Sequence, residues 1–460
     1  MPMGATKSST PKLEQVLVAE SIKDLTHWLE TVEDPTERAH QLAELSKSQM
    51  RVLGDLLDAD TGIELYESVD DHLAAQVLRQ LPATRVAAFL DLLDSDHAGN
   101  VMREVDESTR EKWLTALPAP RAAVLRELLS WPKDSVAAHM VPEALTVRPD
   151  MTAPEAVDAI RGHAAQMRSD SRSGAYIYVT DDDNHLLGVV PFRNLVLAAP
   201  DQTVDDLMET DVITLSPLTD QEDAAQLLID HRLVALPVVD ADNRLLGLLT
   251  EDDAADIAEE EATEDAEKQG GSAPLEVPYL RASPWHLWKK RIVWLLVLFA
   301  AEAYTGTVLR AFEDELEAVV ALAFFIPLLI GTGGNTGTQI TTTLVRAMAT
   351  GQVRFRDVPA ILVKELSTGM LIALAMAAAA MIRAWTLGVG PEVTLTVSLS
   401  VAAIVLWASF AASILPPLLK KCRVDPAVVS APMIATIVDG TGLLIYFMIA
   451  KLTLSELAGL

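Results

Sequence analysis

Asp439 lies in the middle of a segment, residues 431–450, in which nearly every other residue is apolar or small. An ionised carboxylate at bilayer depth is costly unless water, a cation or a polar partner compensates its charge. Gly440 and Gly442 beside it permit close backbone approach, and tight helix packing would explain these glycines alone. The carboxylate among them instead predicts a water-filled path for a cation.

A second concentration of carboxylates lies at residues 251–265, where nine of fifteen residues are Asp or Glu. Asp253 with Asp256, and Glu261 with Glu264, stand three residues apart, so each pair shares one helix face. Like charges so placed repel, and a hard divalent cation between them would make the arrangement favourable. Oxygen ligands alone favour Mg²⁺ or Ca²⁺ over zinc or copper. A solvated, highly charged helix is the alternative interpretation.

Residues 138–256 contain two similar units, each with a helical stretch, a β-rich run, an acidic turn and a second β-rich run. This duplicated pattern resembles a tandem pair of CBS domains. In the second unit GLLTEDD, residues 247–253, matches the nucleotide pattern of that family, in which Thr250 and Asp253 would meet the phosphate and ribose groups of ATP. The first unit reads GVVPFRN and lacks both residues, so at most one nucleotide site is expected, and a purely structural pair is the alternative.

Residues 41–130 carry an internal repeat of twelve residues. Each repeat starts with an apolar residue followed by a helix N-cap residue or a proline at the first helical position. The pairs are Leu45-Ser46, Leu57-Asp58, Val69-Asp70, Leu81-Pro82, Leu93-Asp94, Val105-Asp106 and Leu117-Pro118. The spacing predicts a stack of short helices, a small solenoid, with an ordinary helical domain as the alternative.

Five apolar segments follow, each long enough to cross a bilayer: roughly residues 292–312, 317–345, 360–384, 394–418 and 427–450. In the second, PLLIGTGGNTGTQITTT predicts an irregular polar backbone beside water. Basic residues cluster before the first span, between the second and third, and between the fourth and fifth. This pattern predicts a cytosolic N-terminus and an external C-terminus in the plasma (inner) membrane.

The charge is divided unevenly along the chain. The chain has 36 Lys and Arg, of which 23 lie before Pro284, and 65 Asp and Glu, of which 54 lie before Pro284. The part before Pro284 therefore has a net charge of −31. Such an acidic part argues against nucleic acid or anionic lipid surfaces as partners and for cations, and it is expected to repel itself at low Mg²⁺. A single cysteine, Cys422, excludes an intramolecular disulfide, and no apolar leader predicts a cleaved signal peptide. No P-loop, dinucleotide fingerprint or catalytic triad points to an enzyme.

Taken together, PLLIGTGGNTGTQ, KEL at residues 364–366 and DPAVVSAPMIATIVDGTGLLIY resemble the MgtE magnesium transporters over nearly the whole chain. The expected fold is an all-α superhelical N domain, an α+β tandem CBS pair, a connecting or plug helix and a five-span α-helical membrane domain. The expected boundaries are 1–30 for a disordered N-terminal segment, 31–137, 138–256, 257–284 and 285–460. Thr338 departs from the family, which usually has Asn there.

The resemblance implies a homodimer with a pore on its two-fold axis, lined by the second and fifth spans. Asp439 would be the ion-binding carboxylate, helped by the backbone carbonyl of Ala435. The expected pore-lining residues are Gly331, Gly334, Asn335, Thr336 and Gly440.

The resemblance also implies closure by cytosolic Mg²⁺ bound between the acidic domains and the connecting helix. The expected ligands are Asp253, Asp256, Glu261, Glu264, Asp265, Asp220, Glu222, Asp425, Asp91 and Asp94. Arg232 stands where the family has a further carboxylate. The alternatives are a Na⁺-coupled Mg²⁺ exchanger, a Co²⁺ or Mn²⁺ transporter on the same scaffold, and a membrane-bound nucleotide sensor without transport.

Overall fold

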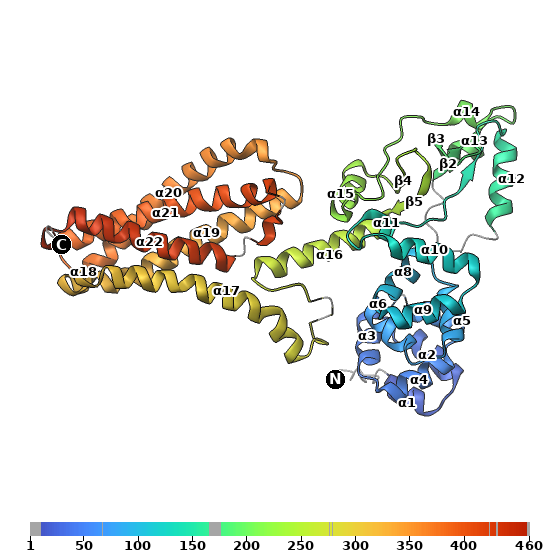
Figure 1. Ribbon diagram of the computed structural model, residues 1–460, viewed down its shortest axis with the longest axis horizontal. Helices are drawn as coiled ribbons and strands as arrows, with labels where there is room; N and C mark the ends of the chain where they lie inside the picture. Colours follow the sequence, from blue (N-terminus) through green and yellow to red (C-terminus); the bar gives the residue numbers. More distant parts are fainter. Residues whose placement is uncertain are drawn as a thin grey trace, which may run out of the picture. The chain divides into compact units, whose positions relative to one another are not determined.

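The computed structural model describes residues 11–66, 68–164, 176–275, 277, 279–422, 424–428 and 431–457. The chain divides into two compact units, Met1–Glu259 and Glu260–Leu460. The expected combination of an all-α N domain, an α+β pair of CBS-like units and a long-helix membrane part is confirmed (Figure 1).

The N domain is helical throughout. Its helices are α1 (Leu13–Val18), α2 (Ile22–Thr31), α3 (Pro35–Ala43), α4 (Lys47–Leu56), α5 (Ala59–Tyr66), α6 (Asp71–Leu78), α7 (Ala83–Leu90), α8 (Ser95–Arg103), α9 (Glu107–Ala116) and α10 (Ala119–Ser130). Helices α4 to α10 each begin directly after one of the repeated pairs, which confirms the stack of short helices. The side chain of Asp70 accepts the N–H of Leu73 at 2.8 Å, as an N-cap residue should. Pro82 and Pro118 occupy the N-cap position itself rather than the first helical position.

The expected disorder of residues 1–30 is wrong for the part that the structure describes. Helices α1 and α2 bury Leu13, Leu17, Leu25 and Trp28 in a core that they share with α3, α4 and α6. Apolar residues at helical spacing give this segment enough buried surface to fold. Residues 1–10 lie outside the described residues.

The CBS pair contains two antiparallel hairpins, as the sequence predicts. Its elements are α11 (Val136–His139), β1 (Thr146–Val147), α12 (Ala153–Ala164), β2 (Tyr176–Thr180), β3 (Leu186–Pro191), α13 (Phe192–Leu197), α14 (Val204–Leu207), α15 (Gln221–His231), β4 (Ala235–Val239) and β5 (Leu245–Thr250). Strand β2 pairs with β3 and with the short parallel strand β1, whereas β4 pairs with β5 alone.

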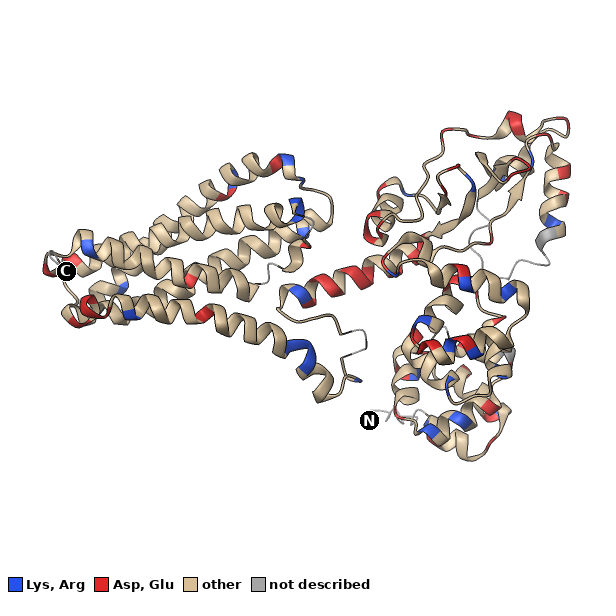
Figure 2. Cartoon of the chain, viewed as in Figure 1, with Lys and Arg blue, Asp and Glu red and all other residues tan. Residues whose placement is uncertain are grey.

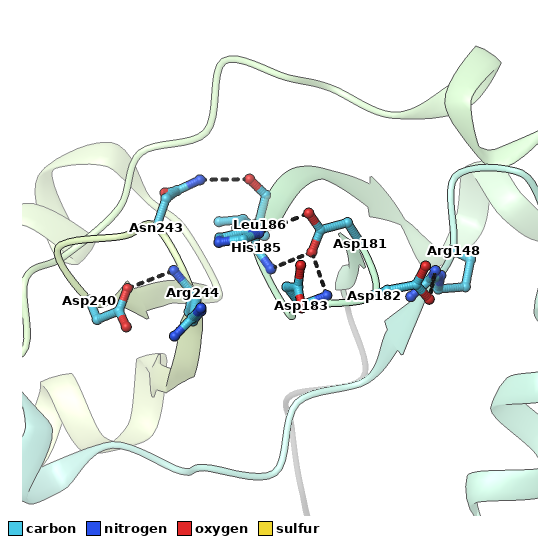
Figure 3. Close-up of polar contacts among 9 residues, drawn as sticks. All are labelled: Arg148, Asp181, Asp182, Asp183, His185, Leu186, Asp240, Asn243 and Arg244. Carbon is cyan, nitrogen blue, oxygen red and sulfur yellow. Dashed lines mark hydrogen bonds and ion pairs between the residues drawn. The ribbon is translucent and has the colours of Figure 1, made fainter.

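The turns of the two hairpins join in a symmetric way. The side chain of Asn184 donates to the carbonyl of Leu245 at 2.7 Å. That of Asn243 donates to the carbonyl of Leu186 at 2.8 Å, the bond drawn in Figure 3. Both asparagines have a positive φ, near 65°, which Asn tolerates better than most residues. The duplicated units therefore form one body with approximate two-fold symmetry.

The N domain and the second CBS-like unit share a continuous apolar core. This core joins residues of α6 to α10 to residues of α11, α15, β4 and β5 and the start of α16 (Glu251–Gln269). At its edge Arg121 Nη1 lies 3.2 Å from Glu143 Oε1, and Ser95 hydrogen-bonds the same carboxylate. The two domains are thus docked within the first unit.

The connecting helix is α16, and its bounds differ from the expected 257–284. It begins at Glu251, directly after β5, and the hydroxyl of Thr250 bonds the carboxylate of Asp253 in its first turn. It ends at Gln269, and Gly271 follows with φ of +73°, a left-handed conformation that favours glycine. Acidic side chains run along most of its length (Figure 2).

Among the described residues of the second unit, five helices are long and apolar enough to cross a membrane, which confirms the expected spans. The elements of this part are α17 (Pro284–Ala311), α18 (Glu313–Ala318), η2 (Val320–Phe325), α19 (Ile326–Ala349), η3 (Phe355–Asp357), α20 (Val358–Leu387), α21 (Pro391–Lys421), η4 (Pro426–Val428), α22 (Ala431–Thr453) and η5 (Ser455–Leu457).

The prediction of an irregular backbone in the second span is wrong. Helix α19 is continuous, and its threonines fit within it, because the hydroxyls of Thr332 and Thr336 find partners in carbonyls four residues earlier, at 2.7 and 2.8 Å. A methyl group on Gly333 would lie 2.7 Å from both Ile404 of α21 and Val438 of α22. The glycine therefore serves close helix packing.

Candidate cation sites

The carboxylate of Asp439 lies at the contact of α22 with α19. A methyl group on Gly334 would come within 3.6 Å of Asp439 Oδ1 and 3.3 Å of Ala435 Cβ, so Asp439 and Ala435 face the same glycine. Asp439 Oδ1 is buried, and the described residues offer it no hydrogen-bond partner. A buried oxygen left in this state requires water or a cation.

The other expected pore-lining residues fall into two groups. Gly331 has no heavy atom within 4 Å of an added methyl group, and Asn335 is exposed, so both are accessible from outside the chain. Thr336 is buried and bonded to the carbonyl of Thr332, and Gly440 is buried against α17. For Thr336 and Gly440, the contacts within the chain indicate packing, and their place in a pore stays a prediction.

Three predicted ligands surround the ammonium group of Lys268, near the end of α16. Lys268 Nζ donates to Asp425 Oδ2 at 2.6 Å and forms an ion pair with Glu264. Burial lowers the pKa of Lys268, but hydrogen bonds to Asp425 and Glu264 outweigh this and raise it overall. Burial and the charge of Asp425 raise the pKa of Asp265. Three carboxylates with one lysine retain negative charge for a further cation, and Glu261 lies one helical turn away.

A third group joins the N domain to the second CBS-like unit. One ligand atom from each of Asp96, His97 and Asp253 lies within 4.8 Å of the others, and this is the one such trio among the described residues. Asp96 is 3% exposed. Burial raises its pKa to about 6, although the hydrogen bond with Asp253 lowers it. Burial, followed by the charge of Asp96, raises the pKa of Asp253 well above its usual range. A divalent cation between the two carboxylates would reverse this repulsion.

The sequence analysis proposed Asp91 and Asp94 as the N-domain ligands, and neither belongs to this trio. Asp91 follows the last residue of α7 and Asp94 precedes the first residue of α8, from where its charge acts on Asp96. Asp96 and His97 were missed. The repeat predicts that they lie in the first turn of α8, just after an N-cap aspartate. It does not predict which face of that turn is buried.

The second pair of CBS carboxylates has a local structural role. Asp220 is the N-cap residue of α15, and its carboxylate accepts the N–H of Glu222 at 3.0 Å. Arg232 ends the same helix in a left-handed conformation. The trio of Asp96, His97 and Asp253 contains neither Asp220 nor Glu222.

The two residues of the nucleotide pattern are engaged with each other. The hydroxyl of Thr250 donates to Asp253, which also contacts Asp96 of the N domain. A nucleotide that used Asp253 would therefore compete with, or rearrange, the contact between the two domains.

Comparison with known proteins agrees with this arrangement of domains. Residues 326–449 match the family model of the MgtE divalent cation transporter, residues 33–134 that of the MgtE intracellular N domain, and residues 135–201 and 204–260 that of the CBS domain. The magnesium transporter MgtE of Thermus thermophilus is 39% identical over 327 residues, which cover 71% of this chain and 72% of that protein. The MgtE of Bacillus subtilis is 32% identical over 323 residues, 70% of each chain.

Among solved structures, the cytosolic domain of the Mg²⁺ channel MgtE in complex with ATP is 28% identical and aligns with a TM-score of 0.49, over 54% of this chain and 99% of that one. The similarity to the two transporters extends over more than two thirds of both chains. The chain therefore belongs to the MgtE family of magnesium transporters, which are membrane transport proteins and not enzymes.

Proposed function

We propose that this chain conducts hydrated Mg²⁺ past Asp439 and closes when cytosolic Mg²⁺ binds its acidic groups. The observation that carries the proposal is the buried Asp439 Oδ1, which has no partner among the described residues and lies beside Gly334 and Ala435. Mg²⁺ loses its inner waters reluctantly, so a carboxylate beside a glycine can hold the hydrated ion through those waters.

The working form is a homodimer whose two-fold axis carries the pore. Gly331 and Asn335 are accessible on α19, where a second copy would complete the pathway. In the CBS pair, Val196 and Leu197 of α13 are 56% and 76% exposed, an apolar surface that a second copy can cover. The basic loops support a cytosolic N-terminus and a C-terminus outside the plasma membrane as part of this proposal. Mass measurement in detergent tests the dimer, and a monomer that transports would refute it.

Closure depends on two acidic groups. Mg²⁺ would bridge Asp96 and Asp253, and a second ion would join Glu264, Asp265 and Asp425 beside Lys268. Because Mg²⁺ binds the closed arrangement better than the open one, it shifts the population toward the closed state. The ion is thus both cargo and regulator.

ATP is proposed as a regulatory ligand of the second CBS-like unit. The hydroxyl of Thr250 and the carboxylate of Asp253 at the end of β5 would meet its phosphate and ribose groups. Calorimetric titration of the full chain with ATP tests this, and an unaltered affinity in Thr250→Ala would remove that residue from the site.

The decisive experiment is Mg²⁺ uptake into proteoliposomes by Asp439→Asn. We expect uptake to fall to the level of empty liposomes, because the neutral amide keeps the shape and removes the charge that binds the cation. Asp314→Asn, which makes the same change at an exposed carboxylate between the first and second spans, serves as the folded control. Wild-type uptake by Asp439→Asn would remove this residue from the pathway.

The same vesicles separate the alternatives. Uptake that requires a Na⁺ gradient would indicate an exchanger, and preferred uptake of Co²⁺ or Mn²⁺ would indicate another cargo. The absence of any ion flux would favour a nucleotide sensor anchored in the membrane.

A further inference from the structure

Glu302 is a carboxylate in the middle of the first span. Between Arg291 and Arg310 it is the only acidic or basic residue of α17. It is exposed on the surface of the single chain. Charged side chains at this depth avoid lipid and face water or protein. We therefore expect Glu302 to face either a water-filled path or a second copy of this chain.

Helix α17 packs against α22 directly beside Asp439. A methyl group on Gly440 would collide with the ring of Tyr304 and lie 3.2 Å from Thr305 Oγ1. Glu302 stands three residues before Thr305, on the same face of α17. The carboxylates of Glu302 and Asp439 are close enough to interact electrostatically.

Thr305 provides the independent observation. It is only 6% exposed, and its Oγ1 is buried with no hydrogen-bond partner among the described residues. Other threonines in the spans, such as Thr332 and Thr336, satisfy their hydroxyls on the carbonyl four residues earlier. Two buried oxygens therefore lack partners around this part of α22: Thr305 Oγ1, beside Gly440 on the α17 side, and Asp439 Oδ1, beside Gly334 on the α19 side. Buried polar atoms in such a position indicate a missing ligand.

We propose that Glu302 and Thr305 of the first span complete the cation site of Asp439, so that a hydrated divalent cation is held between α17 and α22. This inference rests on the proposed conduction past Asp439. It adds residues of the first span to a pathway otherwise lined by the second and fifth spans. Glu302 contributes a second negative charge, and Thr305 contributes a hydroxyl that bonds a water of the ion. The extra charge favours divalent over monovalent cations, since the attraction grows with the charge of the ion.

The test uses the full chain in proteoliposomes, with Mg²⁺ uptake and its block by hexaamminecobalt(III) as readouts. This trivalent complex resembles hexahydrated Mg²⁺ in size and cannot shed its ligands, so its block reports binding through an intact shell. In Glu302→Gln we expect about tenfold weaker block, which corresponds to about 1.4 kcal/mol, and a higher half-saturating Mg²⁺ concentration. In Thr305→Val, which keeps the shape, we expect about threefold weaker block with an unchanged melting temperature, as for one lost neutral hydrogen bond.

Glu317→Gln is the matched control, because Glu317 is an exposed carboxylate that follows the first span, and its block should equal that of the wild type. Wild-type block in both Glu302→Gln and Thr305→Val, while Asp439→Asn still abolishes uptake, would overturn this inference and leave the proposed function intact. Wild-type uptake by Asp439→Asn would refute the proposed function itself. If Glu302→Gln does not fold, the uncharged change at Thr305 decides the matter alone.

Discussion

The contact between Asp96 and Asp253 predicts that removing one charge closes the cytosolic part without Mg²⁺. A rise in the pKa of Asp96 from its ordinary 3.8 to about 6 corresponds to about 3 kcal/mol for burying the ionised carboxyl at neutral pH. Asp96→Asn removes this cost and keeps the shape of the side chain. The equilibrium between docked and separated domains should then shift toward docking by up to about 100-fold.

Amide hydrogen exchange of the full-length protein in detergent measures this shift. In Mg²⁺-free buffer at pH 7.5, we expect peptides from α8 to exchange rapidly in the wild type and slowly in Asp96→Asn. Millimolar Mg²⁺ should slow exchange in the wild type and change the variant little. Asp106→Asn is the matched control, because it removes one charge from the same domain at an N-cap position, where Asn works as well as Asp. Fast exchange of α8 in Mg²⁺-free Asp96→Asn would refute the reasoning.

The same shift fixes the sign of the pH dependence. When the domains are separate, Asp96 has its ordinary pKa and is ionised above about pH 4. When they are docked, its pKa is about 6. Between these two values only the docked form binds the proton, so docking without Mg²⁺ should strengthen as the pH falls below 6. Above pH 6 docking should be weakest, because the ionised carboxylate of Asp96 is then buried at full cost. After correction for intrinsic exchange rates, Asp96→Asn should lack the part of this dependence that Asp96 contributes and keep the part from Asp253, whose pKa is raised by burial first and by the charge of Asp96 second.

Two further predictions concern the second unit. Lys268→Met removes the cation that competes with Mg²⁺ for Glu264 and Asp425, so closure should need about threefold to tenfold less Mg²⁺ in an uptake-inhibition assay, and adding Asp425→Asn, which removes a proposed ligand, should reverse this shift. An unchanged midpoint in Lys268→Met would show that these carboxylates do not bind the closing ion. Gly333→Ala should lower the melting temperature by several degrees, since its methyl group would lie 2.7 Å from two buried branched side chains and overpacking costs about 1–3 kcal/mol. Gly331→Ala, in open space on the same helix, should melt like the wild type, and equal melting of both variants would count against the packing argument.

The elements that the sequence predicts correctly are those specified by local signals. Each helix from α4 to α10 starts where a capping residue or proline follows an apolar residue, because these groups satisfy or replace the free N–H groups of the first turn. The two hairpins follow from the β-rich runs on either side of an acidic turn. The five spans follow from length and hydropathy. None of these predictions requires knowledge of distant contacts.

The errors concern features that tertiary contacts determine. The glycines and threonines of the second span suggest a broken helix, but the hydroxyls find partners inside the helix and the glycines allow close packing on α21 and α22. For the N-domain ligand, Asp91, Asp94 and Asp96 are equivalent by residue type, and only the docking of α8 against the start of α16 distinguishes Asp96. Lys268 was overlooked because its partner Asp425 lies 157 residues away in sequence.

Burial also indicates which acids can sense Mg²⁺. The large net charge before Pro284 comes mostly from exposed groups, and exposed like charges repel by only a few tenths of a kcal/mol and are screened beyond about 8 Å at physiological salt. The acidic turn of the first hairpin illustrates this, since hydrogen bonds to His185 lower the pKa of Asp181 and keep it ionised without any cation. Asp96 is the opposite case, because burying its ionised carboxylate destabilises the docked form of the two domains. We therefore expect neutralising substitutions among exposed acids to leave the Mg²⁺ response unchanged, and the response to depend on the few carboxylates that docking removes from water.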